Sequence, residues 1–200
     1  MSNKIIEFHP LKTPMQTPKS TIFLDRDGCI IEDTHYLSQL SEIKPFAGVN
    51  EVLLKAKKAG YLLVMLTNQS GVAKGIFDED FVKTANSHLN KMLGGVLDGI
   101  YYCPHRPDGN APYNIHCDCR KPKTGMAEQA FKDLNLKKEG SWMIGDKMAD
   151  VKLGQDFGIQ SGLVMTGHGE EEKAKVLAQY PQTPVFSGLV AAIEEILKKN

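Results

Sequence analysis

The sequence predicts an α/β protein with a Rossmann-like, doubly wound and mainly parallel sheet that has helices on both faces. Two observations carry this prediction. Short apolar runs of strand length alternate along the chain with longer segments that we interpret as helices, and this order is typical of a parallel sheet covered by helices. The runs Ile22-Phe23-Leu24 and Tyr61 to Leu66 are continuously apolar, as expected for strands that are buried on both faces.

The expected elements follow one another in a regular order. Strands are predicted at residues 21–24, 61–66, 99–102, 141–144, 161–164 and 184–186. Helices are predicted at residues 48–59, 78–93, 124–134, 150–157 and 187–199. Asp78, Thr124 and Ser187 are expected to begin three of these helices, because their side-chain oxygens can accept hydrogen bonds from the free amides of a first turn.

The chain is long enough for one domain with a sizeable core, which we expect at residues 20–200. Residues 1–19 contain Pro10, Pro14 and Pro18 and are expected to form an extended or poorly ordered N-terminal extension. The segment 34–46 is too short for a large cap domain and is expected to form a small flap.

The charge balance and the hydropathy narrow the classes of partner and location. Lys and Arg together number 24, as do Asp and Glu, so nothing indicates a nucleic-acid or membrane partner. No apolar run approaches the roughly 20 residues that span a membrane, and the N-terminus lacks the apolar region of a signal peptide. We therefore expect a cytoplasmic protein with reduced thiols, acting as a monomer on a small molecule.

Two carboxylates, Asp25 and Asp27, follow the first predicted strand, and Gly28 then allows the backbone to turn sharply. In open α/β sheets the chemistry takes place at the carboxyl ends of the strands. One carboxylate there can attack phosphorus and form an aspartyl-phosphate. The other can protonate the leaving alcohol and then activate water. A polar turn with a structural aspartate is the alternative interpretation of this short motif.

Three later residues supply what phosphoryl transfer needs. Thr67 follows the strand at 61–66, Lys121 precedes the helix at 124–134, and Asp146 follows the strand at 141–144. A lysine can hold a phosphate and offset the charge of a nucleophilic carboxylate. An aspartate at a strand end offers the oxygen ligand that Mg²⁺ prefers. The order of these groups along one α/β pattern favours a phosphotransferase over a structural turn.

Three of the four cysteines and one histidine lie in a single loop: Cys103, His105, Cys117 and Cys119. Three sulfurs and one nitrogen match a closed tetrahedral Zn²⁺ site, although the spacing is not that of a common zinc finger. His116 competes with His105 for the fourth position. The alternatives are a disulfide, which the expected cytoplasmic location opposes, and ordinary buried thiols.

A zinc ion in this loop would have a structural role. Residues 104–116 offer little to build a core, so the ion would clamp the loop and place Arg120 and Lys121, which follow the last thiolate. Cys29, outside the loop, is expected to pack as a small apolar residue without chemistry.

Five segments together resemble the haloacid dehalogenase superfamily of phosphotransferases, over about residues 21 to 167. They are Asp25-Arg26-Asp27-Gly28, Thr67-Asn68-Gln69-Ser70-Gly71, Tyr101-Tyr102-Cys103-Pro104-His105, Cys117-Asp118-Cys119-Arg120-Lys121-Pro122 and Gly145-Asp146-Lys147. Within this superfamily, the set is most similar to the heptose bisphosphate phosphatases.

This resemblance implies a Mg²⁺-dependent phosphatase that removes the phosphate at carbon 7 of a heptose 1,7-bisphosphate, in the synthesis of nucleotide-activated heptose for lipopolysaccharide. Asp25 is the implied nucleophile and Asp27 the implied acid and base, while Thr67 and Lys121 hold the transferring phosphoryl group. The implied Mg²⁺ ligands are Asp25, Asp146 and the backbone carbonyl of Asp27. The matching loop of the family carries zinc, which favours His105 over His116.

Substrate recognition is expected from seven residues that follow these motifs: Asp33, Tyr36, Asn68, Gln69, Ser70, Arg120 and Lys147. Arg120 can bind a second phosphate through paired hydrogen bonds. Tyr36 could instead be a packed aromatic of the flap, and Lys147 a solvated surface lysine.

For some residues near the motifs, a purely structural or surface role is an alternative to a functional one. Asp150 either orients the metal site or is a helix N-terminal carboxylate that the helix dipole favours. The histidines outside the cysteine loop are expected to be surface residues without function: His9, His35, His88 and His168.

Two other functions remain open. A histidinol-phosphate phosphatase has a similar zinc loop, but such enzymes tend to carry arginine after the last aspartate, where this chain has Lys147. A non-catalytic zinc-binding module is disfavoured by the intact acidic pair and by the zero net charge.

Overall fold

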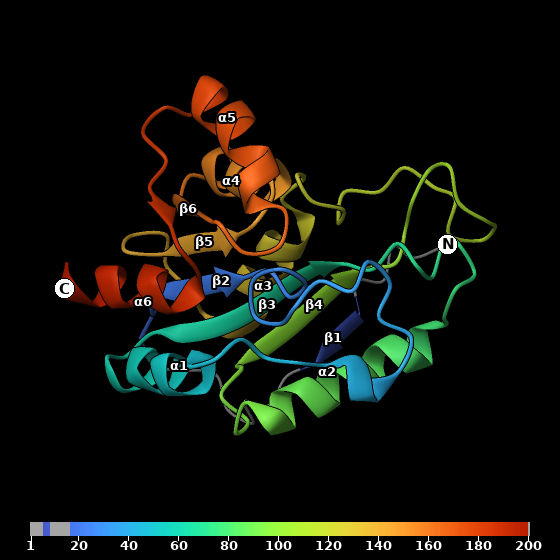
Figure 1. The fold of residues 1–200 in the computed structure, drawn as a ribbon, viewed down its shortest axis with the longest axis horizontal. Helices are drawn as coiled ribbons and strands as arrows, with labels where there is room; N and C mark the ends of the chain where they lie inside the picture. The colour runs from blue at the N-terminus through green and yellow to red at the C-terminus, as the bar shows by residue number, and fades with distance from the viewer. Residues whose placement is uncertain (1–5, 9–16, 200) are drawn as a thin grey trace.

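The computed structural model describes residues 6–8 and 17–199, which form a layered α/β fold (Figure 1). Seven strands make one sheet in the order β1-β4-β3-β2-β5-β6-β7, in which β1 is antiparallel to β4 and the other neighbours are parallel. The strands are β1 Ile6–Phe8, β2 Thr21–Leu24, β3 Leu62–Asn68, β4 Gly99–Cys103, β5 Trp142–Gly145, β6 Gln160–Val164 and β7 Val185–Phe186. The predicted fold class is confirmed.

Helices cover both faces of the sheet. They are the 3-10 helix η1 Leu40–Glu42, and α1 Val49–Lys58, α2 Glu79–Met92, α3 Gly125–Leu134, α4 Met148–Phe157, α5 Gly169–Gln179 and α6 Leu189–Lys198. One core joins α1, α2 and α6 to the face that carries Ile22 and Leu24. A second core joins α3 and α4 to the opposite face, which carries Phe23. This alternation along β2 shows why its run is apolar throughout.

The connections place β2 at the point where the chain changes direction across the sheet. From β2 the chain builds outward through β3 and β4 on one side, and then returns to add β5, β6 and β7 on the other. The carboxyl ends of β2, β3 and β5 are therefore neighbours, as the registers of β2 with β3 and of β2 with β5 also require. A ligand crevice is expected at such a switch point.

Three elements were missing from the sequence prediction: the 3-10 helix η1, helix α5 and strand β1. Helix α5 packs on the sheet through only two buried residues, Gly169 and Val176, so its sequence has no apolar stripe to indicate a helix. Strand β1 is three residues long and lies within the segment 1–19, which was expected to be an extended lead-in. Residues 1–5 and 9–16 of that segment lie outside the described residues.

The predicted helix starts were correct to different degrees. Asp78 caps α2, since its carboxylate accepts a hydrogen bond from the Phe81 amide at 2.7 Å. Thr124 precedes α3 but its hydroxyl bonds the side chain of Glu128 instead of a backbone amide. The last helix begins after Gly188, so the prediction for Ser187 was wrong.

The segment after the first motif forms a short flap, not a cap domain, in the part of the chain that the structure describes. Its two sides are joined where the Glu32 amide donates to the carbonyl of Lys44 at 3.0 Å. Leu37 and Ile43 are buried in the core and hold the flap down. None of the described helices combines the length and the apolar character needed to cross a membrane.

Candidate active site

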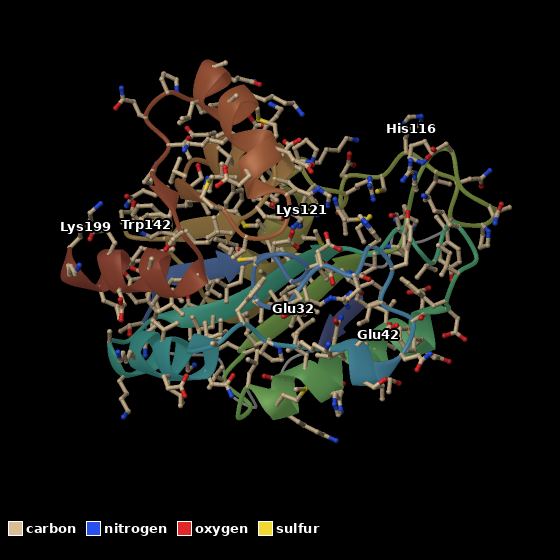
Figure 2. All side chains as sticks on the ribbon, viewed as in Figure 1. Glu32, Glu42, His116, Lys121, Trp142 and Lys199 are labelled. Atoms are coloured by element: carbon tan, nitrogen blue, oxygen red, sulfur yellow. The ribbon has the colours of Figure 1, made fainter. Side chains whose placement is uncertain are left out.

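A buried lysine joins the groups that the strand ends bring together. The Nζ atom of Lys121 lies 2.8 Å from Oδ1 of Asp25 and 2.6 Å from Oδ1 of Asp150, and it donates to the Leu66 carbonyl at 2.8 Å. Lys121 lies near the centre of the molecule in Figure 2 and is 4 % exposed. Burial alone would lower the pKa of its ammonium, but the charges of Asp150 and Asp25 raise that pKa above its ordinary value.

Three buried carboxylates, from Asp25, Asp146 and Asp150, each present an oxygen within 4.8 Å of the others. Burial, together with the charges of Asp25 and Asp150, raises the pKa of Asp146 to about 7. Burial also raises the pKa of Asp150 to about 6, although Lys121 opposes the shift. Lys121 and the more distant Lys147, 3.6 Å from Asp146, do not balance three carboxylates in a low-dielectric site, so the cluster is short of positive charge.

The three carboxylates of Asp25, Asp146 and Asp150 form the carboxylate centre. One oxygen of this centre is available to bind a cation. Oδ2 of Asp146 accepts a hydrogen bond from the His168 amide at 2.8 Å, whereas the buried Oδ1 has no hydrogen-bond partner among the described residues. Buried polar atoms in native proteins are normally satisfied, so an orphaned carboxylate oxygen indicates a missing ligand. An all-oxygen donor set suits Mg²⁺.

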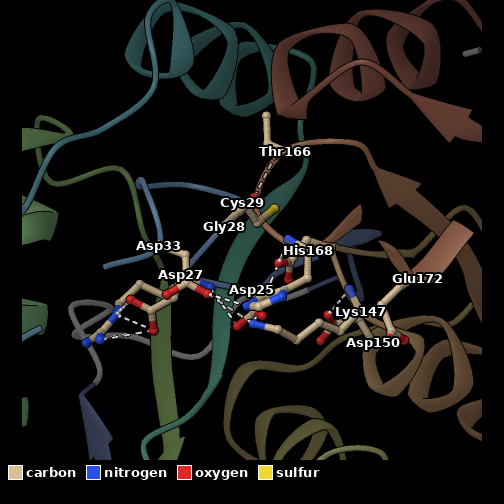
Figure 3. A network of polar contacts seen from close by, with 12 residues as sticks. Asp25, Asp27, Gly28, Cys29, Asp33, Lys147, Asp150, Thr166, His168 and Glu172 are labelled. Carbon is tan, nitrogen blue, oxygen red and sulfur yellow. Dashed lines mark hydrogen bonds and ion pairs between the residues drawn. The ribbon is translucent and has the colours of Figure 1, made fainter. Parts of the chain in front are cut away.

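Two glycines allow the backbone to close over Asp146. A Cβ atom on Gly28 would lie 2.4 Å from Oδ2 of Asp146, and one on Gly167 would lie 2.3 Å from the same atom. Thr166 fixes this approach, because its hydroxyl donates to the Gly28 carbonyl at 2.6 Å (Figure 3). Gly28 also has a φ of 82°, which a side chain rarely adopts. Only glycine fits these two positions.

Asp27 is held on the cavity side by a network that the sequence did not reveal. The guanidinium of Arg26 donates from Nε to both carboxylate oxygens of Asp27 at 3.1 Å, and Nε2 of Gln69 donates to Oδ2 at 2.9 Å. Arg26 is buried and also donates to Gln69 Oε1 at 3.0 Å and to Asn86 Oδ1 at 2.9 Å. Gln69 further donates to the hydroxyl of Thr67 at 2.7 Å. The carboxylate of Asp27 therefore has one fixed orientation.

Asn68 positions the lysine. Its side-chain amide donates to the Lys121 carbonyl at 3.1 Å, while its side-chain oxygen accepts from the Lys121 amide at 3.0 Å. This pair of bonds links the end of β3 to the segment before α3. Of the residues expected to bind substrate, Asn68 and Gln69 thus have their amides engaged in holding Lys121, Asp27 and Thr67.

A cavity of about 430 Å³ opens in front of these groups. Its lining contains Asp27 and all seven residues expected to recognise substrate: Asp33, Tyr36, Asn68, Gln69, Ser70, Arg120 and Lys147. The ammonium of Lys74 forms a hydrogen bond with the hydroxyl of Tyr36. Arg26, Arg106 and two histidines expected to have no function, His35 and His168, also line it.

Lys147 and His168 both contact Asp33 at the mouth of this cavity (Figure 3). Oδ2 of Asp33 lies 3.3 Å from Nζ of Lys147 and 3.2 Å from Nε2 of His168. Lys147 also lies 3.6 Å from Oδ2 of Asp146 and thereby connects the mouth to the carboxylate centre. The interpretation of Lys147 as a simple surface lysine does not fit these contacts.

The four predicted zinc ligands are buried together in the loop after β4. Sγ of Cys119 lies 3.2 Å from that of Cys103 and 3.3 Å from that of Cys117, and 3.3 Å from Nδ1 of His105. All four cysteines of the chain are free thiols, so the alternative of a disulfide is wrong. Two sulfurs of a tetrahedral zinc site with bonds of about 2.3 Å would lie about 3.8 Å apart, which a small outward relaxation reaches.

The electrostatics of the thiol cluster favour a cation. Hydrogen bonding to Cys103, with burial, raises the pKa of Cys119 far above its ordinary value, and burial raises that of Cys117. Burial lowers the pKa of His105, which keeps its ring neutral and able to bind metal. His116, the competitor, is exposed at the outer part of the loop (Figure 2) and lies outside the cluster.

The cysteine loop also shapes the cavity. Nη1 of Arg120 donates to the carbonyl of His105 at 3.2 Å, so the arginine is oriented by the loop itself. The hydroxyl of Tyr113 donates to Glu79 on α2 at 2.8 Å, and this bond ties the loop to the helical layer.

Comparison with known proteins identifies the family. The chain is 41% identical over 169 residues to the D-glycero-β-D-manno-heptose-1,7-bisphosphate 7-phosphatase of Haemophilus ducreyi, which covers 80% of this chain and 93% of that protein. The chain belongs to the heptose-1,7-bisphosphate 7-phosphatase family. It is also 39% identical over 160 residues to the corresponding phosphatase of Chlorobaculum tepidum, covering 75% of this chain and 80% of that protein. A family model described as HAD-hydrolase-like matches residues 118–192.

Solved structures of heptose bisphosphate phosphatases share the fold. The chain superposes with a TM-score of 0.78 on the D,D-heptose 1,7-bisphosphate phosphatase from B. bronchiseptica complexed with magnesium and phosphate, at 29% identity over 91% of this chain and 99% of that chain. A putative HAD-like phosphatase from Mesorhizobium loti matches with a TM-score of 0.76 at 29% identity, covering 96% of this chain and 94% of that one.

Proposed function

We propose that this protein is a Mg²⁺-dependent phosphatase that removes the phosphate at carbon 7 of D-glycero-D-manno-heptose 1,7-bisphosphate, in the synthesis of nucleotide-activated heptose. Membership of the phosphatase family supports the substrate. One observation supports the chemistry above all: Asp25 directly follows the central strand β2, forms an ion pair with Lys121 and lies beside Asp146, whose Oδ1 has no hydrogen-bond partner among the described residues. A phosphate that enters the cavity in front of Asp27 would meet this nucleophile.

In this proposal, two carboxylates have different catalytic roles. Asp25 attacks phosphorus and forms the aspartyl-phosphate as the sugar oxygen leaves. Asp27 gives its proton to that oxygen, and then takes a proton from the water that attacks the phosphorus of the aspartyl-phosphate. Arg26 and Gln69 keep the Asp27 carboxylate turned toward the cavity throughout. Thr67 and Lys121 hold the phosphoryl group during both steps.

Two metal ions belong to the proposal, in different roles. Asp25, Asp146 and the backbone carbonyl of Asp27 would hold Mg²⁺, which offsets the repulsion between an anionic nucleophile and a dianionic phosphate. The buried carboxylate of Asp150 forms an ion pair with Lys121. Its proposed role is to hold that lysine in place, in addition to being a negative charge near the N-terminus of a helix. Cys103, His105, Cys117 and Cys119 would hold a structural Zn²⁺.

The far end of the substrate would reach the outer lining of the cavity. Arg120 is fixed by the carbonyl of His105 and offers a guanidinium for the phosphate at carbon 1. Asp33 and Lys147 would contact sugar hydroxyls and phosphate, and Tyr36, Asn68, Gln69 and Ser70 also line the cavity. Binding energy from the remote phosphate can then orient the reacting end.

We further propose a single catalytic domain at residues 20–200 with an N-terminal extension at 1–19, a monomeric state and a cytoplasmic location. The matching of the family relatives over about four fifths of the chain supports the first point. Light scattering of the purified protein measures its oligomeric state, and a stable dimer would contradict the proposed monomer.

Substrate preference tests the proposed function. The measurement is kcat/KM for both anomers of heptose 1,7-bisphosphate, for histidinol phosphate and for a small aryl phosphate, in wild type and in Arg120→Ala. We expect the bisphosphate to be the best substrate, and Arg120→Ala to reduce its kcat/KM by about tenfold or more, as for the loss of a charged hydrogen bond. The aryl ester should be almost unaffected. If histidinol phosphate is the best substrate, or if all values fall equally, the assignment is wrong.

A further inference from the structure

A third group of potential metal ligands lies at the mouth of the cavity, apart from the carboxylate centre and the cysteine loop. Asp33, His35 and His168 each present a ligand atom within 4.8 Å of the others. All three line the cavity, and the side chains of Asp33 and His168 are partly exposed, at 13 % and 32 %. We propose that these residues form a binding site for a divalent ion of the zinc class, which controls access to the cavity.

His168 is oriented as a metal-ligating histidine would be. Its Nε2 points at Oδ2 of Asp33, 3.2 Å away, while its Nδ1 lies 3.3 Å from Oε2 of Glu171. Metal-bound histidines commonly donate their second ring N–H to a carboxylate, which fixes the tautomer and raises the basicity of the ligand nitrogen. With the proton on Nδ1 facing Glu171, the lone pair of Nε2 faces the cluster.

Asp33 is held with one oxygen available. Its Oδ1 accepts the backbone N–H of His35 at 2.8 Å, which leaves Oδ2 facing His168. Burial opposes ionisation, but the hydrogen bond from His35 and the charge of Lys147 lower the pKa of this carboxyl below its ordinary value. His35 has a φ of 64°, in the left-handed region, and this backbone turn brings its ring back toward the mouth, 6.3 Å from the ring of His168.

The donor set differs from that of the carboxylate centre, and so does the ion it suits. Two imidazoles and one carboxylate are typical ligands of Zn²⁺ and related ions, whereas Mg²⁺ prefers oxygen. Three protein ligands leave a position open to water. Lys147, 3.3 Å from Oδ2 of Asp33, is the present counter-charge, so a bound ion would replace its ammonium at that oxygen.

Occupation of this site should inhibit turnover. An ion on Asp33 would withdraw that carboxylate from substrate, displace Lys147 and narrow the entrance. This consequence rests on the proposed function, in which Asp33 and Lys147 contact the substrate, whereas binding of the ion itself does not. A binding measurement without substrate therefore separates the two claims.

The test is a calorimetric titration of Zn²⁺ into zinc-loaded protein at saturating Mg²⁺, so that the cysteine loop and the carboxylate centre are already filled. We expect one further Zn²⁺ per chain. His168→Ala and His35→Gly should each weaken it by about tenfold or more, and Glu171→Gln by about 10- to 100-fold. Glycine suits the backbone at residue 35, so the second variant keeps the fold. His88→Ala, which removes an exposed histidine on α2, is the matched control and should bind as wild type.

Two results would overturn the site: no additional Zn²⁺ bound, or binding that His168→Ala and His35→Gly leave unchanged. Hydrolysis of heptose 1,7-bisphosphate, followed at saturating Mg²⁺, then reports the consequence. Added Zn²⁺ should raise KM in wild type and in His88→Ala, but not in His168→Ala. Normal Zn²⁺ binding without any inhibition would contradict the control of access and would leave no support for substrate contacts at Asp33 and Lys147.

Discussion

The carboxylate centre and the cysteine loop both carry side chains that could hold a metal ion, yet the fold holds them in different ways. Asp25 is fixed by the sheet, since its amide donates to the Ile144 carbonyl at 2.9 Å, and Lys121 reaches across to the Leu66 carbonyl. The cysteine loop lies outside the sheet and is held by turns, such as the one in which the Arg106 amide donates to the Tyr113 carbonyl at 3.1 Å, and its buried side chains are chiefly the four potential metal ligands. In the proposed account, a metal would supply positive charge at the first site and would hold the chain together at the second.

The largest expected effect comes from the nucleophile. Asp25→Asn keeps the shape of the side chain but removes the attacking charge, so kcat should fall below about one hundredth of wild type. The fold and the zinc content should not change, because the loop is held independently of this carboxylate. Turnover and elemental analysis of the same preparation check both points. Turnover that stays near wild type would exclude covalent catalysis at Asp25.

A substitution in the cysteine loop should affect the zinc site instead of the nucleophile. Cys117→Ser should reduce zinc content to about a tenth or less, since a ligand of a closed site is lost. Activity should fall as well, because Arg120 and Lys121 follow the loop directly. Cys29→Ala is the matched control: it removes a buried thiol beside the sheet and should keep the zinc. Protein that contains no zinc in wild type, with its loop thiols reacting freely, would refute the structural role.

The network behind Asp27 gives a smaller and more selective effect. Asn86→Ala removes the acceptor that holds Arg26 from α2, so the carboxylate of Asp27 should be less well oriented. General acid catalysis contributes about 10²–10⁴-fold, and part of this should be lost for a sugar phosphate. An aryl phosphate, whose leaving group needs no proton, should be affected little.

A matched variant on the same helix tests whether that effect is specific. Asn90 is also a buried asparagine of α2, but its side chain accepts from the Leu97 amide and does not touch Arg26. Asn90→Ala should change kcat/KM for sugar and aryl phosphates by the same factor. Equal losses on both substrates in Asn86→Ala would mean that Asn86 is only structural.

The smallest expected effect is on the unfolding free energy of the Mg²⁺-free protein. Because the pKa of Asp146 is raised to about 7 from 3.8, the folded protein binds more protons than the unfolded chain between these pH values. The unfolding free energy of Mg²⁺-free protein should therefore fall as pH rises from about 4 to about 7. Mg²⁺ should then raise Tm more at pH 8 than at pH 5.5, and Asp146→Asn should lose this difference. An equal Tm shift at both pH values would contradict the charge deficit at this centre.

The fold and the chemical groups were predictable where a single local pattern carries them. Apolar runs predict the strands at 21–24 and 141–144, and a strand end places Asp25 and Asp146 at one edge of a parallel sheet. The presence of Cys103, His105, Cys117 and Cys119 in one loop predicted a cluster that the structure brings together.

Other features depend on contacts between distant parts of the chain, which no local pattern indicates. Asn86 reaches Arg26 across 60 residues of sequence and looks like any polar residue of a helix. His168 contacts Asp33 only because β6 ends beside β5 and the following turn closes over Asp146. Helix α5 lacks an apolar stripe, because only Gly169 and Val176 are buried, with Val176 packed against Leu163 of β6 and Val151 of α4.

The central claim is that the sheet centre carries a covalent reaction at Asp25. Asp27→Asn allows the most direct test, with an aryl phosphate that needs no acid for the first step but still needs a base for the second. The aspartyl-phosphate should accumulate, and acid quenching followed by mass spectrometry of the peptides should find the phosphoryl group on Asp25. Continued phosphate release with no label on Asp25, or with label on another residue, would contradict the account.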